Sequence, residues 1–190
     1  MDFSHYSDQT VEMAVDLVNT RSPFDGTDRL TSVDDLVAFL DRYADGWDPG
    51  DFVPTKPTEN DLADVRALRL RLRQVFHAED ADEAAMTINR LLTDVGAVPR
   101  VSTHGEGPHL HFEPTGHGVG DWLGAATAMG IATVLVEEGI DRIGVCCAGQ
   151  CEDVFVDTSR NRSRRHCSTT CTTRENVARY RSRQKDDATT

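Results

Sequence analysis

The chain has 190 residues, 38% of them hydrophobic and 27% charged, and its formal net charge is −12. This length allows one ordinary domain with a small appendage and excludes two full-sized domains. No apolar run approaches the roughly 20 residues needed to cross a bilayer, and the first residues lack the order of a signal peptide. The sequence therefore predicts a globular cytoplasmic protein with no membrane partner.

The N-terminal part is predicted to be mainly helical. Ser32 and Asp35 stand at capping-box spacing at the start of a helix over residues 32–45, which has apolar residues at i, i+3, i+4 and i+7. A second helix over 58–79 begins with Thr58 as its N-cap. A third, over 80–96, starts at Asp80 and stops at Gly96.

A short hairpin and a long apolar helix follow. Residues 98–103 and 109–114 alternate polar and apolar residues, which is typical of two paired strands. The stretch 121–138 predicts a buried helix that Gly139 ends, and residues 141–145 predict a connecting strand. His104, His109, His111 and His117 gather around the hairpin, where we expect exposed polar residues rather than a second metal site. Asn19 is expected to end the first helix, although it could instead line a pocket.

Charge divides the chain into two unequal parts. Residues 1–141 hold 10 Lys/Arg and 26 Asp/Glu, a charge of −16, whereas residues 142–185 hold 10 Lys/Arg and 4 Asp/Glu, a charge of +6. All five cysteines lie in the basic part. We therefore expect a regulatory domain over 1–141, a zinc module over 142–185 and a disordered tail over 186–190.

The cysteines are spaced as in small zinc modules, in two pairs that each supply two thiolates from one turn. Cys167 and Cys171 form the second pair, and Cys151 is paired with Cys146 or Cys147. Adjacent residues of an extended segment point to opposite sides, and alternation would place Cys147 on the apolar face with Val145. That favours Cys146 as the ligand, in which case Cys147 would be a small buried hydrophobe. The alternative is that Cys147 replaces Cys146 as the ligand.

Zinc is favoured because a segment of about 45 residues cannot bury enough apolar surface to order itself. Zinc binding contributes roughly 10–16 kcal/mol in finger peptides and thereby drives folding. Disulfides would need an oxidising compartment, and a thiol-based redox switch is the other alternative that the fifth cysteine leaves open.

The elements around the cysteines predict a treble-clef-like order of knuckle, short hairpin, second cysteine pair and helix. The helix is expected to begin with Thr172 or Thr173 as its N-cap, with Val177 and Tyr180 packed against the metal core. The predicted fold class is therefore α+β: a mainly helical N-terminal domain with a small hairpin, plus this zinc module.

The segment 151–183 resembles the CGNR-type zinc-finger family. That family has a "FxDxSRNxSRR" segment after its first cysteine pair, and its residues stand here at Phe155, Asp157, Ser159, Arg160, Asn161, Ser163, Arg164 and Arg165. The signature itself is changed to Cys171-Thr172-Thr173-Arg174, and His166 stands where an aromatic residue is usual. A first pair of Cys146 and Cys151 also agrees with the family spacing.

The N-terminal part resembles the ABATE domain, the partner domain of that family. The motifs are "AVDLVNT" near the N-terminus and "DRLTSVDDLVAFL" after it. The two resemblances cover nearly the whole chain and imply a bacterial, cytoplasmic, stress-responsive transcription regulator. For the N-terminal domain they imply no established chemistry. Our hypothesis is that this domain senses a signal, through a small-molecule effector, or forms a homo-oligomer.

The basic residues of the zinc module are the candidate DNA contacts. Arginine is suited to forked contacts with phosphate and with guanine edges. The alternatives are that these side chains pair with the acids of the N-terminal domain, or that they bind an acidic partner protein. The candidates are Arg160, Arg162, Arg164 and Arg165 in a loop, and Arg174, Arg179, Arg181, Arg183 and Lys185 on the following helix.

Catalytic motifs are not found in the sequence. It has no G-x-S-x-G, no phosphate-binding glycine loop and no H-E-x-x-H. Neighbouring acids such as Asp34 and Asp35 are typical of solvated helix faces. We therefore expect that the protein is not an enzyme.

Overall fold

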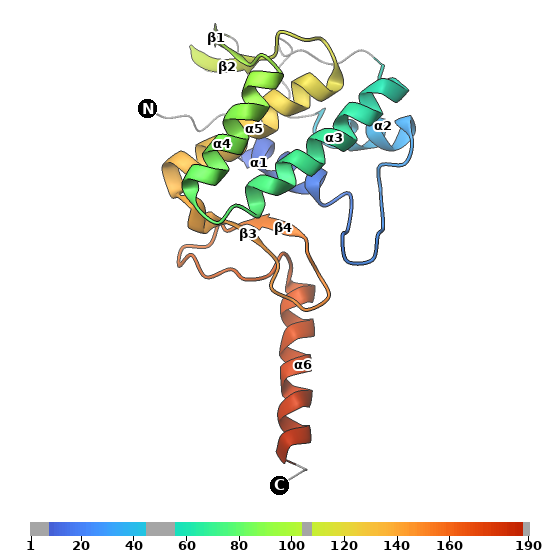
Figure 1. Cartoon of the computed structure of the whole chain (residues 1–190), viewed down its shortest axis with the longest axis vertical. Helices are drawn as coiled ribbons and strands as arrows, with labels where there is room; N and C mark the ends of the chain where they lie inside the picture. The colour runs from blue at the N-terminus through green and yellow to red at the C-terminus, as the bar shows by residue number, and fades with distance from the viewer. Residues whose placement is uncertain (1–7, 45–55, 104–107, 188–190) are drawn as a thin grey trace.

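The computed structural model describes residues 8–44, 56–103 and 108–187. Its elements are, in chain order, α1 (Asp8–Val18), α2 (Val33–Asp41), α3 (Glu59–Phe76), α4 (Ala81–Asp94), β1 (Val98–Ser102), β2 (His109–Glu113), α5 (Val119–Glu138), η3 (Ile140–Arg142), β3 (Ile143–Val145), β4 (Val154–Val156) and α6 (Thr169–Asp187). The predicted α+β class is confirmed. The helices α1 to α5 with β1 and β2 form a rounded body, and α6 projects from its lower end (Figure 1).

Local capping explains where the helices of the body begin. Ser32 and Thr58 each complete a capping box with an acid three residues later, and the Asp80 side chain accepts a hydrogen bond from the N–H of Glu83. Gly96 and Gly139 adopt positive φ after α4 and α5, which favours glycine and ends each helix. The predicted starts of these helices are therefore confirmed.

The core forms around α5. This helix packs against α1, α3 and α4, and its fully buried residues include Leu123 and Ile131. The expectation that no apolar run approaches bilayer-spanning length is wrong, because α5 is long and apolar enough by length and composition. Half of that stretch is buried inside the body, as in the core helix of a globular protein. Gly130 lets α1 approach closely, because a Cβ there would lie 2.6 Å from the Thr10 hydroxyl oxygen.

Two antiparallel hairpins complete the fold. In the first, β1 pairs with β2, which confirms the predicted hairpin, and Arg100 lies opposite His111. The turn between them, including His104, lies outside the described residues. In the second, β3 pairs with β4, with Gly144 opposite Phe155. The sequence placed a hairpin between the two cysteine pairs, but the hairpin instead joins the strand before Cys146 to the strand after Cys151.

An ion pair between the buried Arg69 and the half-buried Asp28 fixes the segment that follows α1. The Arg69 guanidinium of α3 donates to both carboxylate oxygens of Asp28 and to the Thr20 hydroxyl. The Arg69 side chain is 3% exposed. The hydrogen bonds from Arg69 outweigh burial and lower the pKa of Asp28. These contacts hold the segment 19–29 against α3, and this segment lines a cavity that Cys151 and Cys171 also line.

Candidate metal centre

The first cysteine pair lies in the turn between β3 and β4. Cys146 follows the last residue of β3, and its N–H donates to the carbonyl of Asp153 across the hairpin at 2.9 Å. The N–H of Cys151 donates to the carbonyl of Ala148 at 3.0 Å, which closes a tight turn. This backbone geometry brings both side chains to the same end of the hairpin.

The second pair spans the beginning of α6. Ser168 precedes the helix, and its hydroxyl accepts a hydrogen bond from the N–H of Cys171 at 3.2 Å. α6 therefore begins at Thr169, and the expected N-cap at Thr172 or Thr173 is wrong. Because Cys171 lies in the first turn, a metal bound there would be joined directly to the helix.

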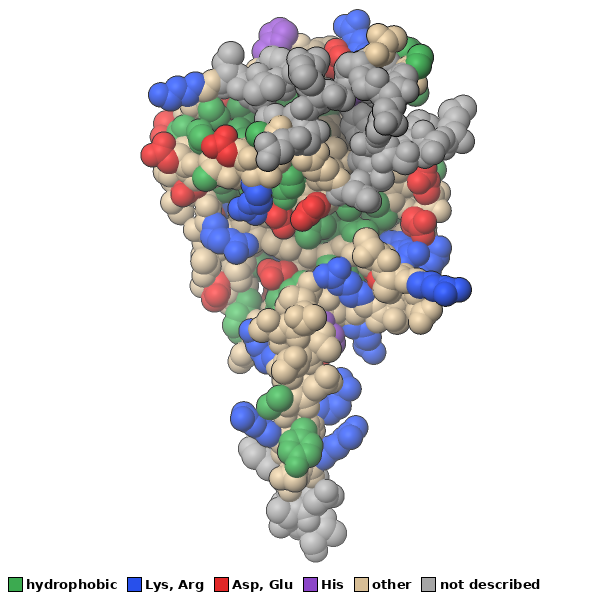
Figure 2. All heavy atoms as spheres, turned by 180° about the vertical axis from the view of Figure 1, so that it is seen from behind, with side chains coloured by type: hydrophobic (Ala, Val, Ile, Leu, Met, Phe, Trp, Pro, Cys, Tyr) green, Lys and Arg blue, Asp and Glu red, His purple; other side chains and the backbone are tan. Residues whose placement is uncertain are grey.

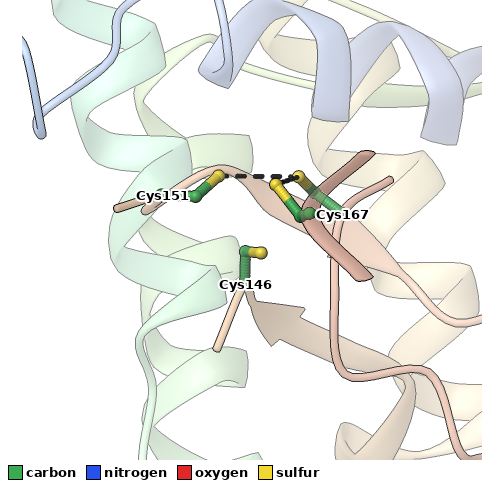
Figure 3. A group of neighbouring side chains, drawn as sticks. Cys146, Cys151 and Cys167 are labelled. Atoms are coloured by element: carbon green, nitrogen blue, oxygen red, sulfur yellow. Dashed lines mark hydrogen bonds between the residues drawn. The ribbon is translucent and has the colours of Figure 1, made fainter. Parts of the chain in front are cut away.

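Four sulfur atoms converge in this region. The Sγ atoms of Cys146, Cys151, Cys167 and Cys171 all lie within 4.8 Å of one another. Cys167 is 3.6 Å from Cys151 and from Cys171, too far for disulfides, and all five cysteines are free. Figure 3 shows Cys151 and Cys167 approaching each other from two sides, with Cys146 nearby.

This arrangement fits zinc. With Zn–S bonds of about 2.3 Å, the sulfurs of a tetrahedral four-cysteine site lie about 3.8 Å apart. The 3.6 Å separations match this edge length. Four thiolates leave no open position, so zinc here would cross-link the chain and supply no catalytic water.

Cys147 lies apart from the cluster. Cys146 is 6% exposed and belongs to the small apolar group around the sulfurs, whereas Cys147 is exposed. The expectation that Cys147 is a buried hydrophobe is wrong, because β3 ends at Val145 and the strand alternation ends with it. The Cys147 N–H instead donates to the carbonyl of Arg165. We propose Cys146, Cys151, Cys167 and Cys171 as the ligands.

The thiols of the cluster have perturbed acidities. Burial raises the pKa of Cys151 to about 12 and also raises the pKa of Cys167. Burial acts in the same sense on Cys171, but hydrogen bonds from Ser168 and the neighbouring thiols outweigh it and lower its pKa. Metal binding must therefore displace protons from thiols that otherwise hold them.

The arginine-rich segment between the pairs is organised around Asp157. Its buried carboxylate accepts hydrogen bonds from the N–H groups of Ser159 and Arg164 at 2.7 and 2.8 Å. Burial alone would raise the pKa of Asp157, but the hydrogen bonds from the Ser159 side chain and from the two backbone N–H groups outweigh it and lower this pKa. The Arg142 guanidinium donates to the carbonyls of Asp157 and Ser159. Much of the resemblance to the family motif is therefore explained by the folding of this loop.

Arg164 holds the second cysteine pair in place. Its guanidinium donates to the carbonyls of Val156, His166 and Cys167, and it stacks 5.1 Å from the centre of the Phe155 ring. Three donors are thus used within the module. This geometry gives Arg164, one of the candidate DNA contacts, a structural role.

The other candidate DNA-binding residues are distributed around the loop and the helix. In the described part of the chain, their ion pairs are Arg162 with Glu138 at 3.5 Å and Arg179 with Glu175 at 3.9 Å. Arg174 donates to the carbonyl of Gln150. Besides Arg164, the exposed arginines among the candidates are Arg160, Arg162 and Arg165 on the loop and Arg174, Arg179, Arg181 and Arg183 on α6, which also contains Lys185.

Two residues of the body anchor the zinc module. The side-chain amide of Asn19 donates to the carbonyl of Val154 at 2.9 Å and accepts from its N–H at 2.8 Å. Arg73 of α3 donates to the carbonyls of Glu152, Val18 and Arg21. Sequence reasoning placed Asn19 at a helix end, where it lies, but missed its pairing with β4. No local pattern indicates a contact across 135 residues.

A cavity of about 320 Å³ lies between the body and the cysteines. The segment after α1 forms one wall, with Asn19 and Arg29 among its residues. The other wall includes Cys151, Cys171 and Arg174. The cavity therefore touches both the helical body and the proposed metal ligands.

A helical body joined to a four-cysteine module defines the class of a zinc-finger protein with an N-terminal partner domain. The chain belongs to the ABATE family, described as "Putative stress-induced transcription regulator", whose model matches residues 12–138. Residues 142–184 match the CGNR zinc finger. Both suspected resemblances are confirmed, and neither description names an enzyme. A comparison with curated proteins finds no match.

Proposed function

We propose that the protein is a cytoplasmic DNA-binding transcription regulator that docks α6 on duplex DNA when zinc is bound. The observation that carries this proposal is the exposure of α6. From Thr172 to Gln184 its side chains are exposed, apart from the half-buried Glu175, and the helix projects away from the body (Figure 1). A helix in this position can enter a groove without hindrance from the body.

The distribution of charge supports the same function. On the face shown in Figure 2, Lys and Arg side chains surround the projecting helix, while Asp and Glu side chains lie on the body. The acidic body would repel DNA and restrict docking to the zinc module. The pair between Arg162 and Glu138 is half-exposed on both sides, and such pairs contribute about 0–1 kcal/mol, so it would not prevent a phosphate contact.

The body would supply regulation. The family description supports a response to stress, and the cavity beside Cys151 and Arg174 gives a small effector a place to contact both parts of the chain. The body is also the part through which copies of the chain would associate.

The test is a titration of fluorescent duplex DNA with the zinc-loaded full chain over a series of salt concentrations. Each neutralised phosphate steepens log K against log salt by about 0.9, so about four contacts predict an affinity about 150-fold weaker at 200 mM than at 50 mM salt. Arg181→Ala with Arg183→Ala should lower the affinity and the slope. Arg90→Ala with Arg100→Ala, which removes equal charge from exposed positions of the body, is the matched control.

Failure of the zinc-loaded chain to bind DNA at any salt concentration would overturn the proposal. A protein-interaction module, in which zinc presents an arginine-rich surface to an acidic protein, would then be the alternative function. Equal weakening by both double variants would also contradict docking through α6, because it would show a general charge effect.

A further inference from the structure

Two large apolar side chains lie exposed in the middle of α6. Val177 is 43% exposed and Tyr180 is 62% exposed, so the expectation that they pack against the metal core is wrong. The Gln184 amide nitrogen donates to the Tyr180 hydroxyl at 2.8 Å. At 3.6 residues per turn, these three residues lie within about 60° of one another. We call Val177, Tyr180 and Gln184 the α6 stripe.

Basic side chains flank the α6 stripe on both sides. Arg174 and Arg181 lie about 80° from its centre in one direction, and Arg179 and Arg183 lie about 110° away in the other. Glu175 lies about 170° from the centre, on the opposite side of the helix. The helix therefore presents an uncharged stripe between two basic rows and turns this acid away from it.

We propose that the α6 stripe contacts base edges in the DNA major groove and determines sequence specificity; this inference rests on the proposed DNA-binding function. The major groove is about 12 Å wide, and an α-helix with its side chains is about 10–12 Å across. A helix seated with the stripe toward the bases brings its two basic rows toward the phosphates of the two strands. This matches the division between phosphate contacts that position a protein and base contacts that specify a sequence.

The chemistry of the stripe indicates which bases it contacts. Val177 and the Tyr180 ring offer apolar surface, which in the major groove is complementary to the C5-methyl group of thymine. Gln184 uses one amide hydrogen on Tyr180 and retains the other hydrogen and its carbonyl oxygen, the pair that bonds N7 and N6 of adenine. The stripe therefore predicts a site containing neighbouring A·T pairs.

A second copy of α6 is a poorer occupant of this stripe. Pairing two stripes would bring the basic rows of both helices together, and like charges placed side by side oppose association. Val177 and Tyr180 are also too few for a stable dimer, since specific interfaces bury about 800 Å² on each partner. Duplex DNA instead places phosphates opposite both rows.

The test begins with selection of the preferred sequence from a random duplex pool by the zinc-loaded full chain. Affinities for the selected and a scrambled duplex are then measured for wild type, Val177→Ala, Tyr180→Ala and Gln184→Ala. Each stripe variant should lose about 5- to 150-fold in affinity for the selected duplex and keep the wild-type affinity and salt slope on the scrambled duplex. Ser182→Ala, on the far side of α6, is the matched control, and circular dichroism and zinc content verify folding.

A second measurement isolates the methyl contact. Replacing the contacted thymine by uracil removes only the C5-methyl group. Wild type should lose affinity, whereas Tyr180→Ala, which has already lost the apolar surface, should lose less. Equal losses in both proteins would overturn the assigned contact.

The outcomes separate this inference from the proposed function. Absence of duplex binding by wild type overturns the proposed function and the inference with it. Binding without sequence preference, or an unchanged preference in all three stripe variants, overturns the inference alone. A wild-type dimer that Tyr180→Ala converts to a monomer with its sequence preference intact would assign the stripe to a second copy and also overturn it.

Discussion

The body and the zinc site are stabilised by different means. The body buries an extended apolar cluster that includes Met13, Leu72 and Leu123. The cluster at the zinc site contains Cys146, Ala148 and Cys171, with Cys151 and Cys167 packed against it. A group of this size cannot offset the conformational entropy of two loops and a helix start, whereas a metal cross-link can. The comparison indicates that the body folds by burial and the cysteine loops fold by binding metal.

The hairpin of β3 and β4 belongs to both regions. Val154 and Val156 are buried in the core cluster of the body, and Ile143 and Val145 pack against it. The turn that joins the two strands contains Cys146, directly after β3, and Cys151. The net charge of the chain changes sign near Asp141, but the apolar core of the body also includes residues after that position. We therefore expect the hairpin to stay folded as long as the body is folded. The cysteine loops should be ordered only when the metal is bound.

Removal of a ligand should have the largest effect. Cys167→Ser is expected to abolish stoichiometric zinc binding, and with it binding free energy on the order of 10 kcal/mol, while the body stays folded. Metal content by mass spectrometry and far-ultraviolet circular dichroism are the measurements. Cys147→Ser is the matched control and should keep one zinc per chain. Loss of zinc in the control would make Cys147 the ligand in place of Cys146.

Removal of the carboxylate that pairs with the buried Arg69 should have the next largest effect, and it should be confined to the body. Asp28→Ala leaves the Arg69 charge buried without its partner, which is expected to destabilise the chain by about 3–5 kcal/mol. Urea unfolding of the zinc-loaded protein measures this. Glu113→Ala breaks the exposed pair with Arg100 and should cost at most about 1 kcal/mol. Equal losses of unfolding free energy in both variants would contradict the claim that burial of Arg69 makes its ion pair the more important one.

Removal of the anchor between the two regions should have the smallest effect. Asn19→Ala leaves the N–H and carbonyl of Val154 without their side-chain partner, at an expected loss of about 2 kcal/mol. Hydrogen exchange should become faster in β4, and unfolding should shift accordingly. Asn89→Ala, at an exposed position on α4, should change neither. If β4 exchanged at the wild-type rate in Asn19→Ala, packing alone would be shown to hold the hairpin.

Local signals predicted the body better than the zinc module. Ser32, Thr58 and Asp80 cap helices through contacts three residues away, which a sequence displays directly. The start of α6 was placed too late because several Ser and Thr residues are equally suited to capping, and only the backbone path from Cys167 selects Ser168.

Long-range contacts explain what sequence reasoning missed. Asn19 meets Val154, and Arg69 meets Asp28, because helices and strands distant in sequence pack together. The exposure of Cys147 depends on where β3 ends, which alternation alone cannot locate. The spacing of the cysteines nevertheless indicated the four sulfurs that converge, since paired turns are characteristic of zinc sites.

Hydrogen exchange of the full chain with and without a zinc chelator tests the central claim most directly. The account predicts that chelation removes protection from the cysteine loops and α6, while α3, α5 and the β3–β4 hairpin keep theirs. Loss of protection in the hairpin together with α6 would show that the metal, and not the apolar core of the body, holds β3 and β4. Unchanged protection of α6 after zinc removal would contradict the dependence of that helix on the metal.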